Sequence, residues 1–293
     1  MIPLPKTNYL NEPNNLRPIS TLPLLSKPIE RHIHKHLLNF LTEHNLLCQS
    51  QSGFRPKHSC HTALAKLCDN WLSAINNSEA VGAVFLDLKK AFNLVNHNIV
   101  LKKLSLYTTK SPFVSLFKSY LELRSQSVYV KGEYSNEGIV RCGIPQGSIL
   151  GPLLFSIFIS DLPMHITRNK VNCDMFADDT SLNTSDKDTD TVQNELQRSI
   201  KEASDWCDNN AMILILQKQK VCYLLLGKNI SFARFTLILV LKTVILNKFM
   251  STGTLALLLM MNLAGDHTLL AHVKQFQKVS LSVVRAQTLC GHS

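Results

Sequence analysis

Residues 175–181 read MFADDTS and set two adjacent aspartates, Asp178 and Asp179, between apolar and β-forming residues. In the longer segment VNCDMFADDTSLNTS, residues 171–185, two short apolar stretches meet at this pair, which predicts a tight β-hairpin. Neighbouring carboxylates repel each other, so a hairpin tip is a poor place for them unless a cation lies between them and a third acid. Carboxylate oxygens are ligands that Mg²⁺ prefers. The pair therefore predicts a divalent-metal site, against the alternative of an ordinary Asp-rich turn.

A third acid follows another apolar run. Residues 80–88, AVGAVFLDL, predict a buried strand that ends at Asp87 and passes into a helix over KKAFNLV, residues 89–95. Asp87 is the natural partner of the aspartate pair, although it could instead cap the following helix. Two neighbouring strands that carry Asp87, Asp178 and Asp179 would form a two-metal site. Such a site deprotonates an attacking hydroxyl and stabilises a leaving pyrophosphate.

The remaining elements are expected from periodicity and from glycine and proline. Apolar residues at helical spacing predict helices over residues 26–47, 61–77 and 188–210. The segment GIPQGSILGPLLFSIFISDLP, residues 143–163, predicts a loop followed by an apolar helix that Pro163 closes. Residues 126–135 alternate like a strand, with a turn expected at Lys131-Gly132.

Charge and cysteine content restrict the class of protein. The 293 residues carry a formal net charge of +10, with a pI of about 9.2. This balance indicates a polyanionic partner, with nucleic acid first and an anionic membrane surface second. The eight cysteines are scattered without a C-x-x-C pair, which indicates reduced thiols of an intracellular protein. The N-terminal residues MIPLPKTNYLNEPNN lack the apolar core of a signal peptide, so secretion is not expected.

The sequence changes character after about residue 230, where it becomes strongly apolar without clear periodicity or capping signals. Three interpretations stay open, namely a buried segment, a stretch whose reading frame has drifted, and a membrane span. Lys242 and Lys248 interrupt the apolar run, so the membrane span is the least favoured.

Five motifs follow one another over the first 226 residues: NNLRPIS (14–20), QSGFR (51–55), FLDLKKAF (85–92), GIPQGSILGPLLF (143–155) and FADDT (176–180). Together they resemble the reverse transcriptase of a non-LTR, LINE-type retrotransposon. The resemblance implies an α+β, right-hand polymerase fold, with fingers and palm over residues 1–226 and an antiparallel palm sheet that carries the metal-binding hairpin. Residues 227–293 are then expected to be a degenerate thumb-like or frame-drifted tail of a truncated or partly decayed copy.

The resemblance also implies roles for individual residues. It makes Asp87, Asp178 and Asp179 the catalytic carboxylates and the ligands of two Mg²⁺ ions, for which Mn²⁺ would be a substitute. It assigns nucleotide binding to Arg17, Arg55, Phe92, Gln146, Gly147 and Lys218. Phe92 matches the position that lies under the sugar and excludes a ribose 2′-hydroxyl, and Arg17 is expected to contact the triphosphate. Without the resemblance, Phe92 would be a core residue and either arginine the donor of a surface salt bridge.

The implied activity is RNA-directed DNA polymerisation. The expected partners are an RNA template, a DNA primer and deoxynucleoside triphosphates, without a membrane, and the expected location is the nucleus or cytoplasm. The oligomeric state stays open. An RNA-dependent RNA polymerase also carries a paired-aspartate hairpin, but Phe92 argues against that class.

The chain also departs from the family pattern. Asn93 stands where the family usually has a second acid, Ile215 replaces an expected asparagine, and no primer-grip turn follows Gly227. These departures keep open a second interpretation, an inactive remnant that keeps the fold and at most binds RNA.

Overall fold

The computed structural model describes residues 1–5, 16–107, 111–122, 124–166 and 170–215. The chain divides into two units, Met1–Ile230 and Ser231–Ser293, and every described residue belongs to the first. The predicted boundary at 226/227, the apolar tail and Lys218 lie outside the described residues and stay predictions.

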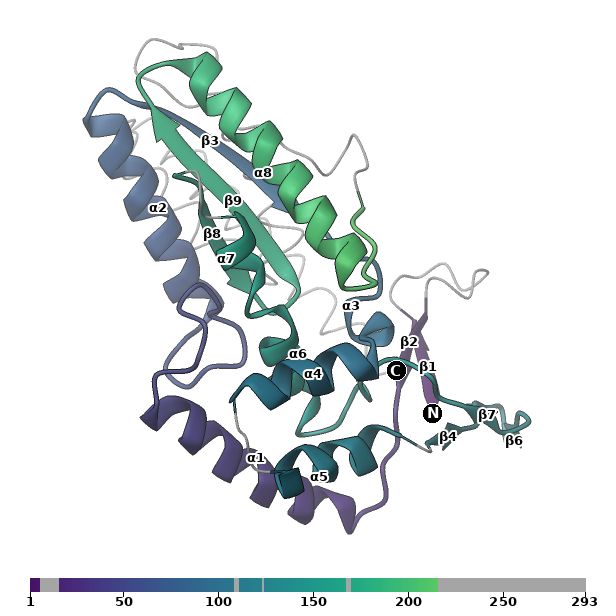
Figure 1. The fold of residues 1–293 in the computed structure, drawn as a ribbon. Coiled ribbons are helices and arrows are strands. Elements are labelled where there is room, and N and C mark those ends of the chain that lie inside the picture. The colour runs from purple at the N-terminus through teal and green to yellow at the C-terminus, as the bar shows by residue number, and fades with distance from the viewer. Residues whose placement is uncertain (6–15, 108–110, 123, 167–169, 216–293) are drawn as a thin grey trace, which may run out of the picture. The chain divides into compact units, whose positions relative to one another are not determined.

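The described elements are mixed helices and strands (Figure 1). The helices are α1 (Ser26–Glu43), α2 (Cys60–Asn76), α3 (Ala91–Leu94), α4 (His97–Tyr107), α5 (Ser111–Leu121), α6 (Gly151–Ile159), α7 (Leu162–Ile166) and α8 (Thr189–Asn209). The strands are β1 (Ile2–Pro5), β2 (Leu16–Ile19), β3 (Ala80–Leu86), β4 (Ser125–Gln126), β5 (Tyr129–Val130), β6 (Glu133–Tyr134), β7 (Gly138–Ile139), β8 (Asn172–Phe176) and β9 (Asp179–Asp186).

The central sheet is antiparallel, with the strand order β3-β9-β8. Every residue of β3 is buried because helices cover both faces of the sheet (Figure 1). On one face, a Cβ at Gly82 would lie 2.4 Å from Val192 of α8. On the other face, Lys66 of α2 lies 3.0 Å from the Asp174 carboxylate, and the strand register places Gly82 and Asp174 on opposite sides. A strand covered on both sides gains from apolar residues at every position, which explains the continuous apolar run.

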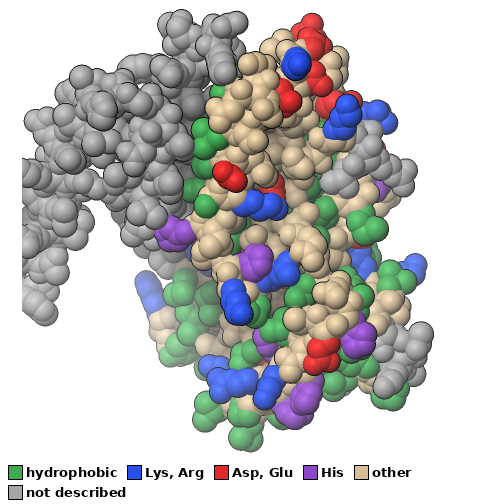
Figure 2. All heavy atoms as spheres, turned by 90° about the vertical axis from the view of Figure 1, so that its left-hand side faces the viewer, with side chains coloured by type: hydrophobic (Ala, Val, Ile, Leu, Met, Phe, Trp, Pro, Cys, Tyr) green, Lys and Arg blue, Asp and Glu red, His purple; other side chains and the backbone are tan. Residues whose placement is uncertain are grey.

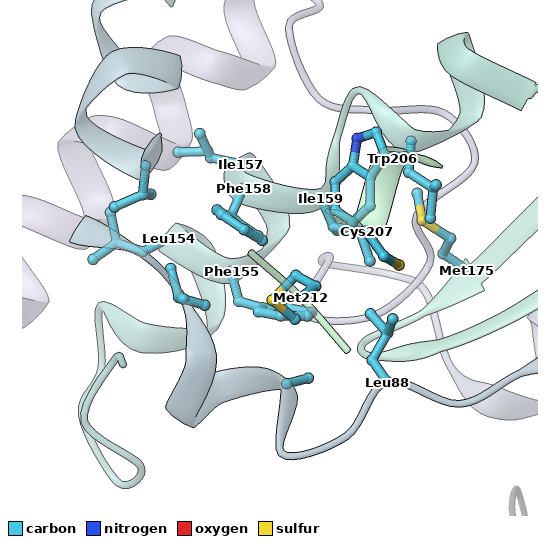
Figure 3. Close-up of a cluster of buried hydrophobic side chains, with 14 of the residues drawn as sticks. Leu88, Leu154, Phe155, Ile157, Phe158, Ile159, Met175, Trp206, Cys207 and Met212 are labelled. Atoms are coloured by element: carbon cyan, nitrogen blue, oxygen red, sulfur yellow. The ribbon is translucent and has the colours of Figure 1, made fainter. Parts of the chain in front are cut away.

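The main core surrounds α6, which is hydrophobic on all sides (Figure 3). Phe155 and Phe158 are fully buried there, and Trp206 of α8 meets Phe158 edge-on with a centroid separation of 6.0 Å. A helix that is apolar all round must be enclosed by other elements. In this fold α6 packs against α4, and Phe158 packs against Trp206 of α8.

Most element predictions agree with the structure. The helices predicted over 61–77 and 188–210 are α2 and α8, and the turn at Lys131-Gly132 connects β5 to β6. The helix predicted over 26–47 stops at Glu43, because Asn45 adopts a left-handed φ of 53° that ends the helix.

The prediction that Pro163 closes the apolar helix is wrong. The helix α6 ends at Ile159, and Pro163 is the second residue of a new short helix, α7. Proline is accepted in the first helical turn because its missing N–H would have no partner there.

Two findings on the described residues bear on membrane spans and on the state of the cysteines. Among the described helices, none combines the length and hydropathy that a membrane span requires. The cysteines within the described ranges are free thiols.

Candidate active site

The turn between β8 and β9 carries the aspartate pair. Phe176 faces Asp179 in the strand register, which leaves Ala177 and Asp178 as a two-residue turn. Ala177 has a φ of 58°, a left-handed conformation that residues with a Cβ adopt reluctantly. The chain is thus forced into an unfavourable backbone conformation directly before Asp178.

Asp87 lies at the same end of the sheet. Leu86 pairs with Thr180, so continuing the antiparallel register places Asp87 opposite Asp179. Residues opposite each other on antiparallel strands point to the same face, with Cβ atoms about 4.5–5.5 Å apart. All three aspartates are half-buried. The fold therefore gathers the predicted carboxylates at one sheet end. As they stand, the described side chains form no group of three or more His, Cys, Asp or Glu that could hold a metal ion.

The N-terminus of α2 adjoins this sheet end. Burial raises the pKa of the Cys60 thiol, the first residue of α2, and the negative charge of Asp179 raises it further. Ser59 caps this helix by accepting a hydrogen bond from the Thr62 amide.

The segment after α8, residues 213–215, forms main-chain hydrogen bonds with residues 87–89, next to the aspartate site. The Ile215 amide donates to the Asp87 carbonyl at 2.9 Å, and the Lys89 amide donates to the Ile213 carbonyl at 2.9 Å. Ile215, noted from the sequence as a departure from the family pattern, therefore uses its main chain to hold the backbone of Asp87.

Gln51, the first residue of the motif QSGFR, contacts the turn directly, although the sequence indicated no role for it. Its amide nitrogen donates to the Ala177 carbonyl at 3.0 Å, and its amide oxygen accepts from the Ala177 amide at 2.9 Å. The sequence feature that could have pointed to Gln51 is a polar residue followed by a glycine two positions later, which allows a close approach of another segment. Nothing local indicated that this residue reaches a turn 126 positions away.

Phe92 connects two of the motifs. It lies in α3 and stacks on Phe155 of α6, with centroids 4.5 Å apart at 22°, and it meets Phe54 edge-on at 6.1 Å. Its side chain is half-buried. Phe92 therefore packs against the core and keeps part of its surface accessible, and its predicted contact with the sugar stays a prediction.

The loop that holds Gln146 and Gly147 packs against two other motifs. Gln146 donates from its side chain to Asn93 Oδ1 at 2.8 Å, and its carbonyl accepts from the Ser20 amide at 2.8 Å. Gly147 has a φ of 100°, and a Cβ there would lie 3.2 Å from the Ser20 carbonyl oxygen. Arg17 is an exposed residue of β2, the strand that ends just before Ser20. The structure therefore brings the strand of Arg17 to the loop of Gln146 and Gly147.

Arg55 points inward rather than into solvent. Its guanidinium donates to the carbonyls of Cys48 at 2.9 Å and Gln51 at 3.3 Å. In this arrangement Arg55 supports the loop that carries Gln51. Its predicted nucleotide contact, like that of Lys218, stays a prediction.

Basic side chains are frequent on one face of the molecule. On the face shown in Figure 2, Lys and Arg side chains occur from top to bottom, His side chains lie in the middle and lower parts, and acidic side chains are most numerous at the top. A surface of this kind attracts polyanions by long-range electrostatics.

Solved structures of telomerase share the fold. An apo telomerase from Candida tropicalis superposes with a TM-score of 0.51 at 14% identity, covering 70% of this chain and 41% of that one. A telomerase from the same organism, in complex with a fragment of telomeric RNA, gives a TM-score of 0.51 at 16% identity and covers 70% of this chain and 34% of that one. Identity this low shows the fold alone, a polymerase fold of mixed α and β structure.

The sequence comparisons show the family. The family described as reverse transcriptase (RNA-dependent DNA polymerase) matches residues 4–260. A probable RNA-directed DNA polymerase from transposon BS of Drosophila melanogaster is 36% identical over 200 residues, 67% of this chain and 22% of the relative. The RNA-directed DNA polymerase from the mobile element jockey of the same species is 33% identical over 201 residues, again 67% and 22%. The chain belongs to the reverse transcriptase family and to its non-LTR, LINE-type members. It spans about a fifth of the length of these relatives.

Proposed function

We propose that this chain is an RNA-directed DNA polymerase domain that adds deoxynucleotides to the 3′-hydroxyl of a primer on an RNA template. The observation that carries the proposal is the strand register, which sets Asp87 opposite Asp179 and next to the turn of Asp178. Family membership supports the reaction class. In this proposal the sheet β3-β9-β8 is the palm of a right-hand polymerase, and the segments before it contribute to the fingers.

The donor set of the site fits Mg²⁺. Its carboxylates are hard oxygen donors, half-buried at one sheet end. Mg²⁺ in nucleotide-processing sites is commonly bound through one or two carboxylates, with waters and substrate phosphates as the other ligands. A ready-made group of three ligands is therefore not required before the nucleotide binds. We assign Asp87 and Asp178 as the principal ligands and Asp179 as the adjacent acid.

Bound Mg²⁺ would supply positive charge that acidifies the primer hydroxyl and neutralises the pyrophosphate. The chain's own residues would position the reactants. Phe92, fixed between Phe155 and Phe54, would offer a flat surface to the deoxyribose. Gln146 and Gly147 would support the base pair of nucleotide and template, and Arg17 would bind the triphosphate.

RNA and primer would bind mainly through their phosphates. The net charge of +10 and the basic side chains of the face in Figure 2 support such binding. The telomerase that shares the fold and was solved in complex with a fragment of telomeric RNA supports an RNA partner as well. Phosphate contacts carry little sequence information and weaken as salt rises. We accordingly propose an enzyme with low template specificity.

The test is deoxynucleotide incorporation with Mg²⁺ on a homopolymeric RNA template with an annealed DNA primer. Wild type is expected to extend the primer, and Asp178→Asn is expected to reduce the rate about a hundredfold or more, because metal-assisted charge stabilisation is lost. Asp205→Asn, an exposed acid on α8, is the matched control and is expected to keep the wild-type rate. Circular dichroism and thermal melting of each variant establish that it is folded.

The alternative is a chain that keeps the fold and binds RNA without turnover. It is favoured by two departures from the family pattern, namely Asn93 in place of an acid and the missing primer-grip turn after Gly227. A folded wild type that binds the template but incorporates no nucleotide would establish this alternative. Incorporation of ribonucleotides at the same rate as deoxynucleotides would contradict the role of Phe92.

A further inference from the structure

Gln51 makes an unusual set of hydrogen bonds with the turn that presents Asp178. The side chain is buried, with 2% of its surface exposed. It bonds both main-chain polar groups of Ala177, and its amide oxygen also accepts from the Gly53 amide at 2.7 Å. A planar side-chain amide that engages the N–H and C=O of one residue imitates the edge of a neighbouring strand.

The main chain on either side of Gln51 pairs with β8, and this pairing brings the Gln51 side chain to the turn. The Met175 amide donates to the Ser50 carbonyl and the Ser52 amide donates to the Met175 carbonyl, each at 2.8 Å. Residues 50–52 thus pair with β8 in the parallel sense at Met175. Beyond Met175 the hairpin turns away, and main-chain pairing stops. The side chain of Gln51 continues the pairing past this point and reaches the turn.

The turn has a conformation that calls for such support. Ala177 has a φ of 58°, which costs free energy for a residue with a Cβ. The supporting loop also approaches very closely, since a Cβ at Gly53 would lie 2.2 Å from the Ala177 nitrogen. Arg55 in turn donates to the carbonyl of Gln51 itself. The loop, the glutamine and the arginine therefore act on a single residue, the one directly before Asp178.

We propose that Gln51 is a positioning residue that holds the turn at Ala177 and so sets the position of the Asp178 carboxylate. This inference rests on the proposed polymerase function for its consequence in catalysis, but not for its structural part. Gln51 is assigned no contact with substrate or reacting atoms. It acts through the backbone conformation of Ala177.

The structural part is tested by amide hydrogen exchange of the whole chain. In Gln51→Met, which keeps the size but not the amide, the Ala177 and Gly53 amides are expected to exchange about tenfold faster or more, because local opening needs less free energy. In Gln51→Glu, the carboxylate can still accept from both amides but cannot donate to the Ala177 carbonyl, so exchange at these two sites is expected to rise as well. Amides within β3 should be unchanged in both variants.

A matched control separates local release from general loss of stability. Asp188→Ala removes the N-cap of α8, whose carboxylate accepts from the amides of Asp190 and Thr191. It is expected to lower the melting temperature while leaving the Ala177 amide protected. An unchanged Ala177 amide in a folded Gln51→Met would overturn the proposal. A uniform rise along β3 and β9 would do the same.

The catalytic part is read from steady-state kinetics. Gln51→Met is expected to lower kcat about tenfold or more, since small displacements of catalytic groups are costly, while KM for the deoxynucleotide changes little. Asp188→Ala should leave both unchanged. A released turn with an unchanged kcat would refute the positioning role. If wild type itself has no turnover, the polymerase proposal fails, and the exchange measurements still decide whether Gln51 holds the turn.

Discussion

Asn93 shows how a single residue connects two motifs. Its side-chain oxygen accepts a 2.8 Å hydrogen bond from the amide of Gln146, so it links α3 to the loop proposed to bind the nucleotide. An aspartate, one of the two acidic residues that the family resemblance would allow there, offers an acceptor of the same shape. The substitution therefore keeps the contact while it removes a charge.

This residue-scale contact predicts opposite results for two variants. Asn93→Asp is expected to keep stability near that of wild type, because a carboxylate accepts the same bond more strongly. Asn93→Leu leaves the Gln146 amide without this acceptor and is expected to lower the free energy of unfolding by about 1–2 kcal/mol. Urea denaturation measures both, with Asn39→Leu on the exposed side of α1 as the control. Equal urea midpoints for Asn93→Leu and wild type would contradict this role.

At the scale of elements, the start of α6 depends on a residue of α1. Glu30 is buried, and its carboxylate accepts from the amides of Ile149 at 2.7 Å and Leu150 at 3.3 Å. The first amides of a helix have no partner within it, and a carboxylate at that end also complements the helix dipole. Glu30 therefore sets where the loop of Gln146 and Gly147 ends and α6 begins.

Replacement of Glu30 tests this cap. Glu30→Leu is expected to lower the free energy of unfolding by about 2–3 kcal/mol, because buried amides lose a charged acceptor. Glu30→Gln keeps one carbonyl acceptor and is expected to lose less. Chemical denaturation provides the measurement, and Glu43→Leu, at an exposed position of the same helix, is the matched control. If Glu30→Leu and Glu43→Leu have equal effects, Glu30 does not cap α6.

At the scale of the whole molecule, one lysine joins three helices. Lys103 of α4 donates to the Phe158 carbonyl at 2.6 Å and to the Asp161 carboxylate at 2.7 Å, and its ammonium lies over the rings of Phe158 and Trp206. Trp206 of α8 donates to the same carboxylate oxygen of Asp161 at 3.0 Å. Burial lowers the pKa of Lys103, although Asp161 opposes this shift.

The lowered pKa predicts how global stability depends on pH. Between the folded-state pKa of Lys103 and its unfolded value of about 10.4, the unfolded chain binds more protons than the folded chain. The free energy of unfolding of wild type is therefore expected to rise relative to Lys103→Met as the pH increases through this window. Urea denaturation at several alkaline pH values measures the difference. For Lys102→Met, at the exposed neighbouring position, the difference should not change with pH, and a flat difference for Lys103→Met would refute the prediction.

Local patterns in the sequence were sufficient for most elements. The apolar periods of α2 and α8 and the continuous apolar run of β3 indicated these elements correctly, because burial of one stripe or of both faces requires those patterns. The error at Pro163 came from a local rule that has an exception in the first turn of a helix. The pairing of β1 with β2 was not predicted, since neither short strand has a distinctive period.

The order of five motifs was sufficient to indicate the reverse transcriptase family, and the carboxylates, whose chemistry belongs to the side chain in any fold, led to the proposed reaction. The sequence by itself also indicated which strand ends would carry those carboxylates. Only the tertiary structure decided that Asp87 lies opposite Asp179, that Asn93 bonds Gln146, and that Gln51 holds the turn at Ala177. These relations join residues that lie far apart in the chain, and they depend on strand register and loop path. Periodicity reports only which residues share a face of one element, so it contains no information about such partners.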